Sequence, residues 1–172
     1  ILQLLSTLES VDGRFQYLVS EGKITAIIDY AHTPDALKNV LETINTIRSG
    51  NEQLITVVGC GGDRDVEKRP KMGAIAAQLS TKVIFTSDNP RSENPDTIIQ
   101  HIEAGVPPQH YKKTIAISDR KQAIKTACQM ANEHDIILVA GKGHETYQEI
   151  QGVRSEFDDR KTISELLIAL NK

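Results

Sequence analysis

The sequence predicts an α/β domain, and three observations lead to that prediction. Short apolar runs alternate along the chain with segments whose apolar residues repeat at helical spacing. Some runs, such as the Ile-Ile-Leu-Val-Ala at 136–140, are apolar without interruption, as strands buried on both faces require. The length of 172 residues suits one domain with a short appendage. Together these features predict a Rossmann-like, three-layer domain with a mostly parallel sheet of roughly six strands.

The expected elements can be placed in order along the chain. Residues 1–9 have the pattern of the last turns of a helix, which the turn around Gly13 interrupts. Strands are then expected at 15–19, 24–30, 54–58, 82–86, 114–117 and 136–140. Helices with an apolar face are expected at 34–47, 119–133 and 158–170, and a further helix is expected over roughly 68–79.

Three helix starts carry capping signals. Residues 33–35 (Thr-Pro-Asp) and 94–96 (Asn-Pro-Asp) each combine an N-cap, a proline at the first helical position and an acid that complements the helix dipole. Residues 118–119 (Ser-Asp) offer the same cap without the proline. Capping therefore explains residues 33–35 without any function.

Composition excludes several classes of protein. The 20 basic and 23 acidic side chains give a formal charge of −3, which is unsuited to binding nucleic acid. Aromatic residues make up 4% of the chain and Trp is absent, so base-stacking platforms are not expected. The sequence lacks an uncharged apolar run of the roughly 18 residues that a membrane-spanning helix needs.

The cysteines indicate the cellular compartment of the protein, and the first residues indicate whether the chain is part of a longer one. Cys60 and Cys128 have neither CxxC nor metal-ligand spacing, which fits buried thiols in a reducing cytoplasm. The chain begins with Ile1 inside an apolar pattern and shows no signal peptide. We therefore expect a fragment of a longer cytoplasmic protein.

Four polar loops follow strands, at the sheet edge where parallel α/β domains bind ligands. Asp29 and His32 follow the strand 24–30, either as structural or solvated groups or as contacts to a phosphate, ribose or adenine. Residues 59–65 (GCGGDRD) are either a tight turn or a place where glycines let the backbone approach a ligand. They match neither the dinucleotide-binding nor the P-loop pattern.

The third and fourth loops add further charged groups. Residues 87–91 (SDNPR) are either a surface turn or a support for Arg91, which can hold a carboxylate in a bidentate fork. In residues 141–145 (GKGHE) the two glycines open backbone space and Glu145 supplies a negative charge. A P-loop is rejected here, because Ser or Thr should follow Lys142.

The second to fourth loops together suit a zwitterionic amino-acid group. They supply cations for a carboxylate, anions for an ammonium group and an amide for orientation, in Arg64, Asp88, Asn89, Arg91 and Glu145. We find no nucleophile–base arrangement and no metal-ligand spacing. Chemistry alone thus indicates an α/β domain that binds a small charged ligand.

At these residues the sequence resembles a known family. DYAHTPDAL, GCGGDRD followed by KRPKMG, DNPR, and VAGKGHE occur in the order and spacing of the C-terminal domain of the Mur ligases of peptidoglycan synthesis. The stretch at 66–67 (Val-Glu) departs from the small, basic or polar pair expected there, which affects local charge alone. DNPR is associated with the members that add meso-diaminopimelate, whereas lysine-adding relatives depart from it at the arginine.

The resemblance implies a domain organisation and a reaction. Residues 1–10 would be the tail of a missing central ATPase domain, and residues 11–172 the C-terminal domain. The whole enzyme would activate the glutamate carboxylate of UDP-N-acetylmuramoyl-L-alanyl-D-glutamate as an acyl phosphate, which the amine of meso-diaminopimelate then attacks. ATP and Mg²⁺ would be bound mainly by the central domain, so the fragment should be inactive alone.

The resemblance also implies roles for individual residues. Arg14, Asp29 and His32 match positions that face ATP. Positions that hold meso-diaminopimelate are matched by Arg64, Asp88, Asn89, Pro90, Arg91, Gly141 and Glu145. We expect no catalytic residue and no metal ligand in this fragment. The expected partners are the two substrates and the remaining domains of the same polypeptide, without nucleic acid or membrane.

Two alternatives remain open from the sequence. One is a related ATP-dependent ligase domain, either lysine-adding or of the folylpolyglutamate type, although the intact DNPR favours diaminopimelate. The other is a free-standing α/β module that binds a small ligand without a catalytic partner. A comparison of lysine with diaminopimelate as acceptor distinguishes the first alternative from the leading hypothesis. A reading frame that continues upstream of Ile1 into a P-loop would exclude the second.

Overall fold

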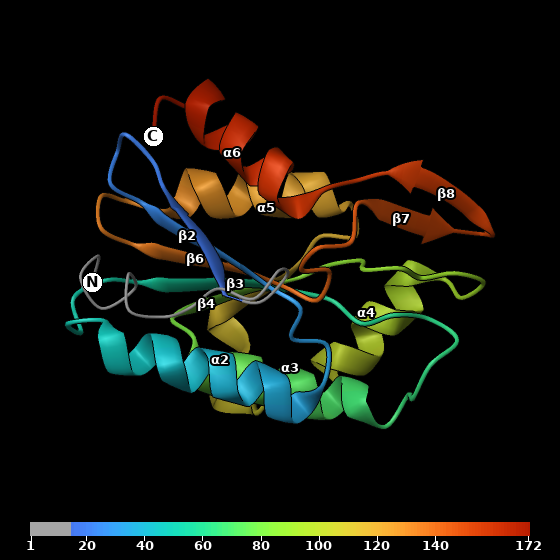
Figure 1. Cartoon of the computed structure of the whole chain (residues 1–172). Coiled ribbons are helices and arrows are strands. Elements are labelled where there is room, and N and C mark those ends of the chain that lie inside the picture. Colours follow the sequence, from blue (N-terminus) through green and yellow to red (C-terminus); the bar gives the residue numbers. More distant parts are fainter. Residues whose placement is uncertain (1–14) are drawn as a thin grey trace.

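A computed structural model describes residues 15–172, which are built around a six-stranded sheet (Figure 1). Its strand order is β1-β2-β6-β3-β4-β5. β1 runs antiparallel to β2, and the other neighbours in the sheet pair in parallel. The strands are β1 (Gln16–Val19), β2 (Thr25–Asp29), β3 (Leu54–Val58), β4 (Lys82–Phe85), β5 (Thr114–Ala116) and β6 (Ile136–Ala140).

Helices cover both faces of this sheet, which confirms the predicted three layers (Figure 1). One side carries α2 (Pro34–Ile47), α3 (Lys68–Leu79) and α4 (Pro95–Glu103), and the other carries α5 (Arg120–Met130) and α6 (Asp159–Ala169). A 3₁₀ helix, η1 (Pro108–Lys113), leads into β5. The predicted helices at 119–133 and 158–170 are thus real but shorter at their ends.

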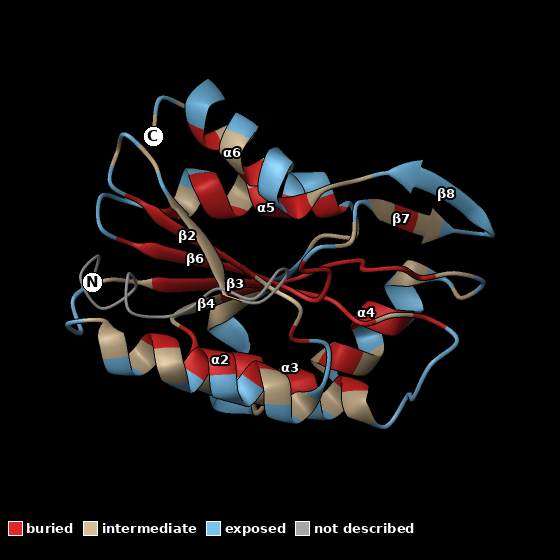
Figure 2. Ribbon diagram, in the orientation of Figure 1, coloured by how far each residue is buried: buried red, intermediate tan, exposed pale blue. Residues whose placement is uncertain are grey.

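The two central strands, β3 and β6, are buried along their whole length because each face of the sheet has its own apolar core (Figure 2). In β6, Leu138 belongs to the core beneath α2, α3 and α4, whereas Val139 belongs to the core beneath α5 and α6. Successive side chains of a strand point to opposite faces, so both cores draw on the same strand. This accounts for the uninterrupted apolar runs in the sequence.

The predicted helix caps are present. Asn94 Oδ1 accepts from the backbone N–H of Asp96 at 2.8 Å, and Thr33 Oγ1 accepts from that of Ala36 at 3.3 Å. Asp119, rather than the serine before it, caps α5. These bonds satisfy N–H groups that a helix start otherwise leaves without partners.

An antiparallel hairpin between β6 and α6 was not predicted. It consists of β7 (Tyr147–Ile150) and β8 (Val153–Glu156), and it projects beyond the sheet (Figure 1). In these strands Gln148 is the one residue classed as buried, and β8 is exposed throughout. The hairpin therefore lacks the apolar alternation that makes a strand visible in a sequence.

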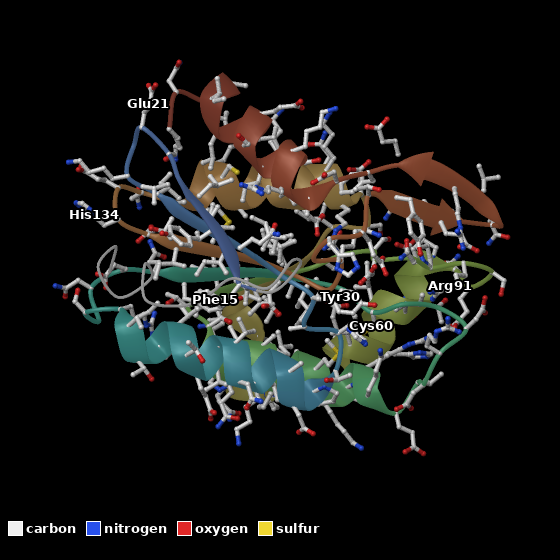
Figure 3. The ribbon with its side chains drawn as sticks, viewed as in Figure 1. Phe15, Glu21, Tyr30, Cys60, Arg91 and His134 are labelled. Carbon is white, nitrogen blue, oxygen red and sulfur yellow. The ribbon has the colours of Figure 1, made fainter. Side chains whose placement is uncertain are left out.

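The strand order brings the carboxyl ends of β2, β6, β3 and β4 together at one end of the sheet. Tyr30, Cys60 and Arg91 lie toward this end, whereas Glu21 and His134 lie at the opposite one (Figure 3). Within residues 15–172, no helix is long and apolar enough to cross a bilayer. The expected helix at 1–9 and the expected boundary near residue 11 fall outside the described residues.

Candidate functional site

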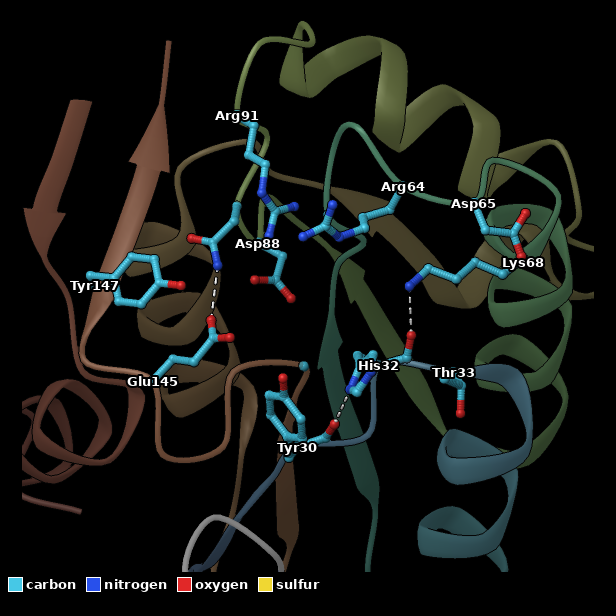
Figure 4. A pocket seen from close by; sticks show the side chains of 13 residues that line it. Tyr30, His32, Thr33, Arg64, Asp65, Lys68, Asp88, Arg91, Glu145 and Tyr147 are labelled. Carbon is cyan, nitrogen blue, oxygen red and sulfur yellow. Dashed lines mark hydrogen bonds between the residues drawn. The ribbon is translucent and has the colours of Figure 1, made fainter. Parts of the chain in front are cut away.

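A pocket of about 460 Å³ opens where the four loops meet (Figure 4). It sits at the carboxyl ends of β2, β3, β4 and β6, as expected for a parallel α/β sheet. Its walls are formed by Tyr30, His32, Thr33, Gly61, Arg64, Asp65, Lys68, Asp88, Asn89, Arg91, Gly141, Glu145 and Tyr147.

One wall of the pocket is cationic. The guanidinium groups of Arg64 and Arg91 extend toward each other from loops that follow β3 and β4, with Asp88 beside them (Figure 4). Arg91 Nη1 donates to the Gly62 carbonyl at 2.7 Å, which uses one of its five N–H groups. Two neighbouring guanidinium groups repel each other, so this wall suits an anion such as a carboxylate.

The glycines of the second loop serve packing against the third loop. A Cβ on Gly62 would clash with the Pro90 carbonyl oxygen. The backbone N–H of Gly62 also donates to the Asn89 carbonyl at 2.9 Å. Gly62 therefore allows the two loops to pack closely, whereas Gly61 lines the pocket itself.

The adjoining wall is anionic and contains an amide. Asn89 Nδ2 donates to Glu145 Oε2 at 2.8 Å, and Asp88 lies in the same wall (Figure 4). Gly141 has φ of +119°, and a Cβ there would come within 2.5 Å of Asp88 Oδ2. Glycine is therefore needed at the end of β6 for the Asp88 carboxylate to fit.

Two tyrosines complete this wall. The ring of Tyr30 points into the pocket toward Glu145 and Asp88 (Figure 4). Burial, followed by the charges of these two carboxylates, raises the pKa of the Tyr30 phenol, so it stays a neutral hydrogen-bond donor. Tyr147 lines the pocket from β7, in the hairpin that was not predicted.

The end of the pocket beside α2 has a different character. His32 Nδ1 lies 2.8 Å from the Tyr30 carbonyl oxygen, which can only accept, so Nδ1 carries the proton. Lys68 Nζ donates to the His32 carbonyl at 2.8 Å, and Thr33 lies at the first turn of α2. A lysine beside a helix N-terminus suits a phosphate or another anion.

Seven of the predicted site residues line this pocket: His32, Arg64, Asp88, Asn89, Arg91, Gly141 and Glu145. Pro90 is buried behind the wall instead, with its carbonyl packed on Gly62. Asp29 lies at the end of β2 outside the lining, where Oδ2 accepts from the Phe15 N–H at 2.7 Å. Arg14 falls outside the described residues.

Other lining residues were not singled out from the sequence. Tyr30 and Lys68 occur inside the quoted motifs, and their polar side chains beside a loop were the available signal. Lys142 was set aside with the rejected P-loop pattern, yet its ammonium group is buried beneath the anionic wall. Tyr147 had no signal, because its place depends on the hairpin.

Neither cysteine has the properties of a nucleophile. Cys60 and Cys128 are free and buried, and burial raises their thiol pKa to about 12 and about 11. Among residues 15–172, no group of three or more His, Cys, Asp or Glu side chains is arranged to hold a metal ion. The pocket thus has the groups of a binding site rather than those of a nucleophile–base pair.

Comparison with known proteins relates this chain to one family. Residues 13–143 match the family model of the Mur ligase, glutamate ligase domain. The chain is 58% identical, over 100% of its length, to a UDP-N-acetylmuramoyl-L-alanyl-D-glutamate–2,6-diaminopimelate ligase of Cytophaga hutchinsonii, of which it covers 35%. The chain spans about a third of the length of the curated relatives it matches.

Solved structures place the fold in the same group. A structure of a ligase with this same name gives a TM-score of 0.85 at 43% identity, over 96% of this chain and 33% of that one. A bifunctional folylpolyglutamate synthase/dihydrofolate synthase of Yersinia pestis gives 0.58 at 20% identity, over 96% and 32%. This second likeness shows a shared fold.

Proposed function

The chain belongs to the Mur ligase family, as its glutamate ligase domain, and we propose that it selects the acceptor amino acid of an ATP-dependent ligase. The acceptor is meso-diaminopimelate, joined to UDP-N-acetylmuramoyl-L-alanyl-D-glutamate in peptidoglycan synthesis. The observation that carries the proposal is the charge arrangement of the pocket, where Arg64 and Arg91 lie beside Asp88 and Glu145. This arrangement is complementary to the carboxylate and ammonium groups of one amino-acid centre.

The cationic wall supports diaminopimelate over lysine. The two acceptors share the reacting amine, but the far end of diaminopimelate carries a second carboxylate that lysine lacks. Arg64 and Arg91 would pair with that carboxylate, while Asp88 and Glu145 would accept from the ammonium group beside it, and the Asn89 NH₂ group, which donates to Glu145, would orient that carboxylate. A site of paired charges rejects a ligand that leaves one of them without a partner.

The domain's own residues would bind and orient the acceptor amine. ATP, when bound, converts the glutamate carboxylate into an acyl phosphate, which lets an amine displace phosphate. Arg14, Asp29 and His32 are proposed to face the nucleotide, and the polar end formed by His32 and Lys68 fits a phosphate. ATP and Mg²⁺ would be held mainly by another domain of the same polypeptide.

The domain would therefore act as one part of a larger cytoplasmic enzyme. Its partners would be the two substrates and the remaining domains of the polypeptide, and we expect no ligation by residues 1–172 alone. Two free, buried thiols are consistent with a reducing compartment.

The first test is an amide-shift NMR titration of the chain with meso-diaminopimelate, with L-lysine as the control ligand. We expect shifts at Arg64, Asn89, Arg91 and Glu145 with meso-diaminopimelate alone, at the millimolar affinity of a site that lacks its other domains. Equal shifts with L-lysine would refute the proposed selectivity. If a folded sample shows no shifts, the pocket needs the other domains in order to bind, and the Arg91 variants of the full-length ligase described below then test the proposal.

A further inference from the structure

Lys142 is the one lysine with a fully buried side chain in the described part of the chain, and the proposed binding reaction does not use it. It lies beneath the anionic wall rather than in the lining of the pocket. Gly141 and Gly143 on either side have φ of 119° and 54°, and this local backbone turns the side chain between them inward. A buried ammonium group loses its hydration, and this free-energy cost must be offset by hydrogen bonds and charge pairs with specific partners.

The partners of Lys142 match its three N–H donors. Nζ donates to Asn89 Oδ1 at 2.9 Å and to the Tyr147 carbonyl at 2.8 Å, and it lies 3.4 Å from Asp88 Oδ1. These acceptors belong to the loop after β4 and to the start of β7. A single side chain therefore joins the loop after β4 to β7, two of the segments that form the anionic wall.

The first consequence concerns the orientation of Asn89. Its Oδ1 accepts from Lys142 and from the Glu149 N–H at 3.0 Å, so both lone pairs of that oxygen are engaged behind the pocket. The amide nitrogen is left on the pocket side, where it donates to Glu145. A flipped amide would place its NH₂ group against two donors and present an acceptor to the ligand.

The second consequence concerns charge. Lys142 Nζ lies 3.9 Å from Glu145 Oε2 in addition to its approach to Asp88. Burial lowers the pKa of Lys142, and the charge of Asp88 acts against that shift. A positive charge beneath the two carboxylates offsets the repulsion between them, so that both can lie beside one ligand ammonium group.

We propose that Lys142 is a positioning residue for acceptor specificity: it sets the orientation of Asn89 and holds the carboxylates of Asp88 and Glu145 close together, and so determines which donors and acceptors line the acceptor site. The proposal rests on the proposed function of this pocket. The competing interpretation is that Lys142 merely joins two segments, in which case its loss lowers stability without changing ligand recognition.

The test compares Lys142→Met, which keeps the length and removes the charge, with Lys161→Met as a matched control. Lys161 is 62% exposed and pairs with Glu156 at 3.7 Å. In the full-length ligase we expect Lys142→Met to raise KM for meso-diaminopimelate by about 10- to 100-fold. KM for ATP in Lys142→Met should stay within about threefold of wild type. In Lys161→Met, the KM values for meso-diaminopimelate and for ATP should both stay within that range.

A second readout is independent of ligation. In the free chain, the side-chain amide protons of Asn89 should exchange with solvent about tenfold or more faster in Lys142→Met than in wild type. If Lys142→Met does not fold, Lys142→Gln, which keeps one N–H donor without the charge, is measured in the same way. We expect the same direction of change in KM and in amide exchange.

The outcomes separate this inference from the proposed function. A folded variant with unchanged KM and unchanged Asn89 exchange would overturn the positioning role, as would a loss of melting temperature with KM unaltered. A wild-type ligase that does not use meso-diaminopimelate would refute the proposed function instead. In that case the exchange rates of Asn89 would still decide whether Lys142 orients the amide.

Discussion

Arg91 is held on two sides before any ligand arrives. Its backbone has φ of 51°, and its N–H donates to the Glu149 carbonyl at 3.0 Å. Its Nη1 donates to the Gly62 carbonyl at 2.7 Å, which leaves the rest of the guanidinium fork directed at the pocket (Figure 4). Because the side chain is already ordered, little rotamer entropy remains to be lost when it binds a carboxylate.

Replacing Arg91 by alanine in the full-length ligase should lower kcat/KM for meso-diaminopimelate by about 30-fold to several thousand-fold, on the order of 2–5 kcal/mol. The distal carboxylate of the acceptor would lose its charge partner. Arg91→Lys should recover part of the activity, because lysine keeps the charge but not the fork. Steady-state rates with both acceptors measure this, and the exposed Arg160→Ala is the control. Wild-type rates in Arg91→Ala would contradict the assigned role.

At the scale of elements, the loops after β3 and β4 form one unit anchored on α3. Arg69 of α3 is fully buried, and its two Nη atoms donate to Glu93 at 2.9 and 2.8 Å. Glu93 also accepts from the Asp63 N–H at 2.6 Å. The hydrogen bonds from Arg69 lower the pKa of Glu93 below its ordinary value of 4.5. The loops that carry Arg64 and Arg91 are therefore fixed by a carboxylate that must stay ionised.

Glu93→Gln should reduce the free energy of unfolding at neutral pH by about 1–3 kcal/mol, because the buried Arg69 charge loses its partner. A carboxyl group with a lowered folded pKa stabilises the protein fully above its unfolded value and stops doing so as pH falls through the folded value. The difference in the free energy of unfolding between wild type and Glu93→Gln should therefore become smaller below about pH 4.5. Urea unfolding between pH 7 and 3 measures it.

The control for this prediction is Glu133→Gln. Glu133 pairs with Lys23 on the surface, where both side chains are more than half exposed. Solvent screens such a pair, so we expect no measurable change in unfolding at any pH. A constant gap between Glu93→Gln and wild type down to pH 3 would show that the Glu93 charge does not contribute.

At the scale of the whole molecule, a buried ion pair joins the layers behind the pocket. Arg120 at the start of α5 donates through Nε and Nη2 to the two oxygens of Asp159 at the start of α6, at 2.8 and 2.7 Å. It also donates to the carbonyls of Ser87 and Ala140, at 3.0 and 3.1 Å. Ser87 lies just after β4, and Ala140 is the last residue of β6. One guanidinium group therefore connects α5 and α6 to the strand ends that carry the pocket.

Asp159→Asn should lower the free energy of unfolding by about 3–5 kcal/mol, since it leaves the Arg120 charge buried without a counter-ion. That is a large part of the stability of a typical domain. Chemical denaturation measures the loss, and Glu156→Gln, at an exposed position in β8, is the matched control. A loss no larger than that of the control would show that the strand ends are held by backbone contacts and not by this pair.

Much of the architecture was predictable because its signals are local. The apolar runs at 54–58 and 136–140 and the caps at Thr33 and Asn94 depend on neighbours a few residues away. The same holds for the loops after the strands, since a parallel sheet brings the carboxyl ends of its strands to one edge. Seven of the ten predicted site residues therefore share one pocket, while the ligand they bind stays a prediction.

The tertiary structure decided which groups meet across that edge. Lys142 contacts Asn89 across a separation of 53 residues, because β6 lies beside β3 in the sheet and β3 lies beside β4. The hairpin that supplies Tyr147 was hidden, since its strands bury almost no side chains and so leave no periodic pattern. The sequence left open whether the glycines at 59–62 form a tight turn or approach a ligand, and the structure divides them: Gly62 packs on the loop after β4, whereas Gly61 lines the pocket. Periodicity and capping report on adjacent residues, whereas burial of a charge and close packing of loops depend on the order of strands.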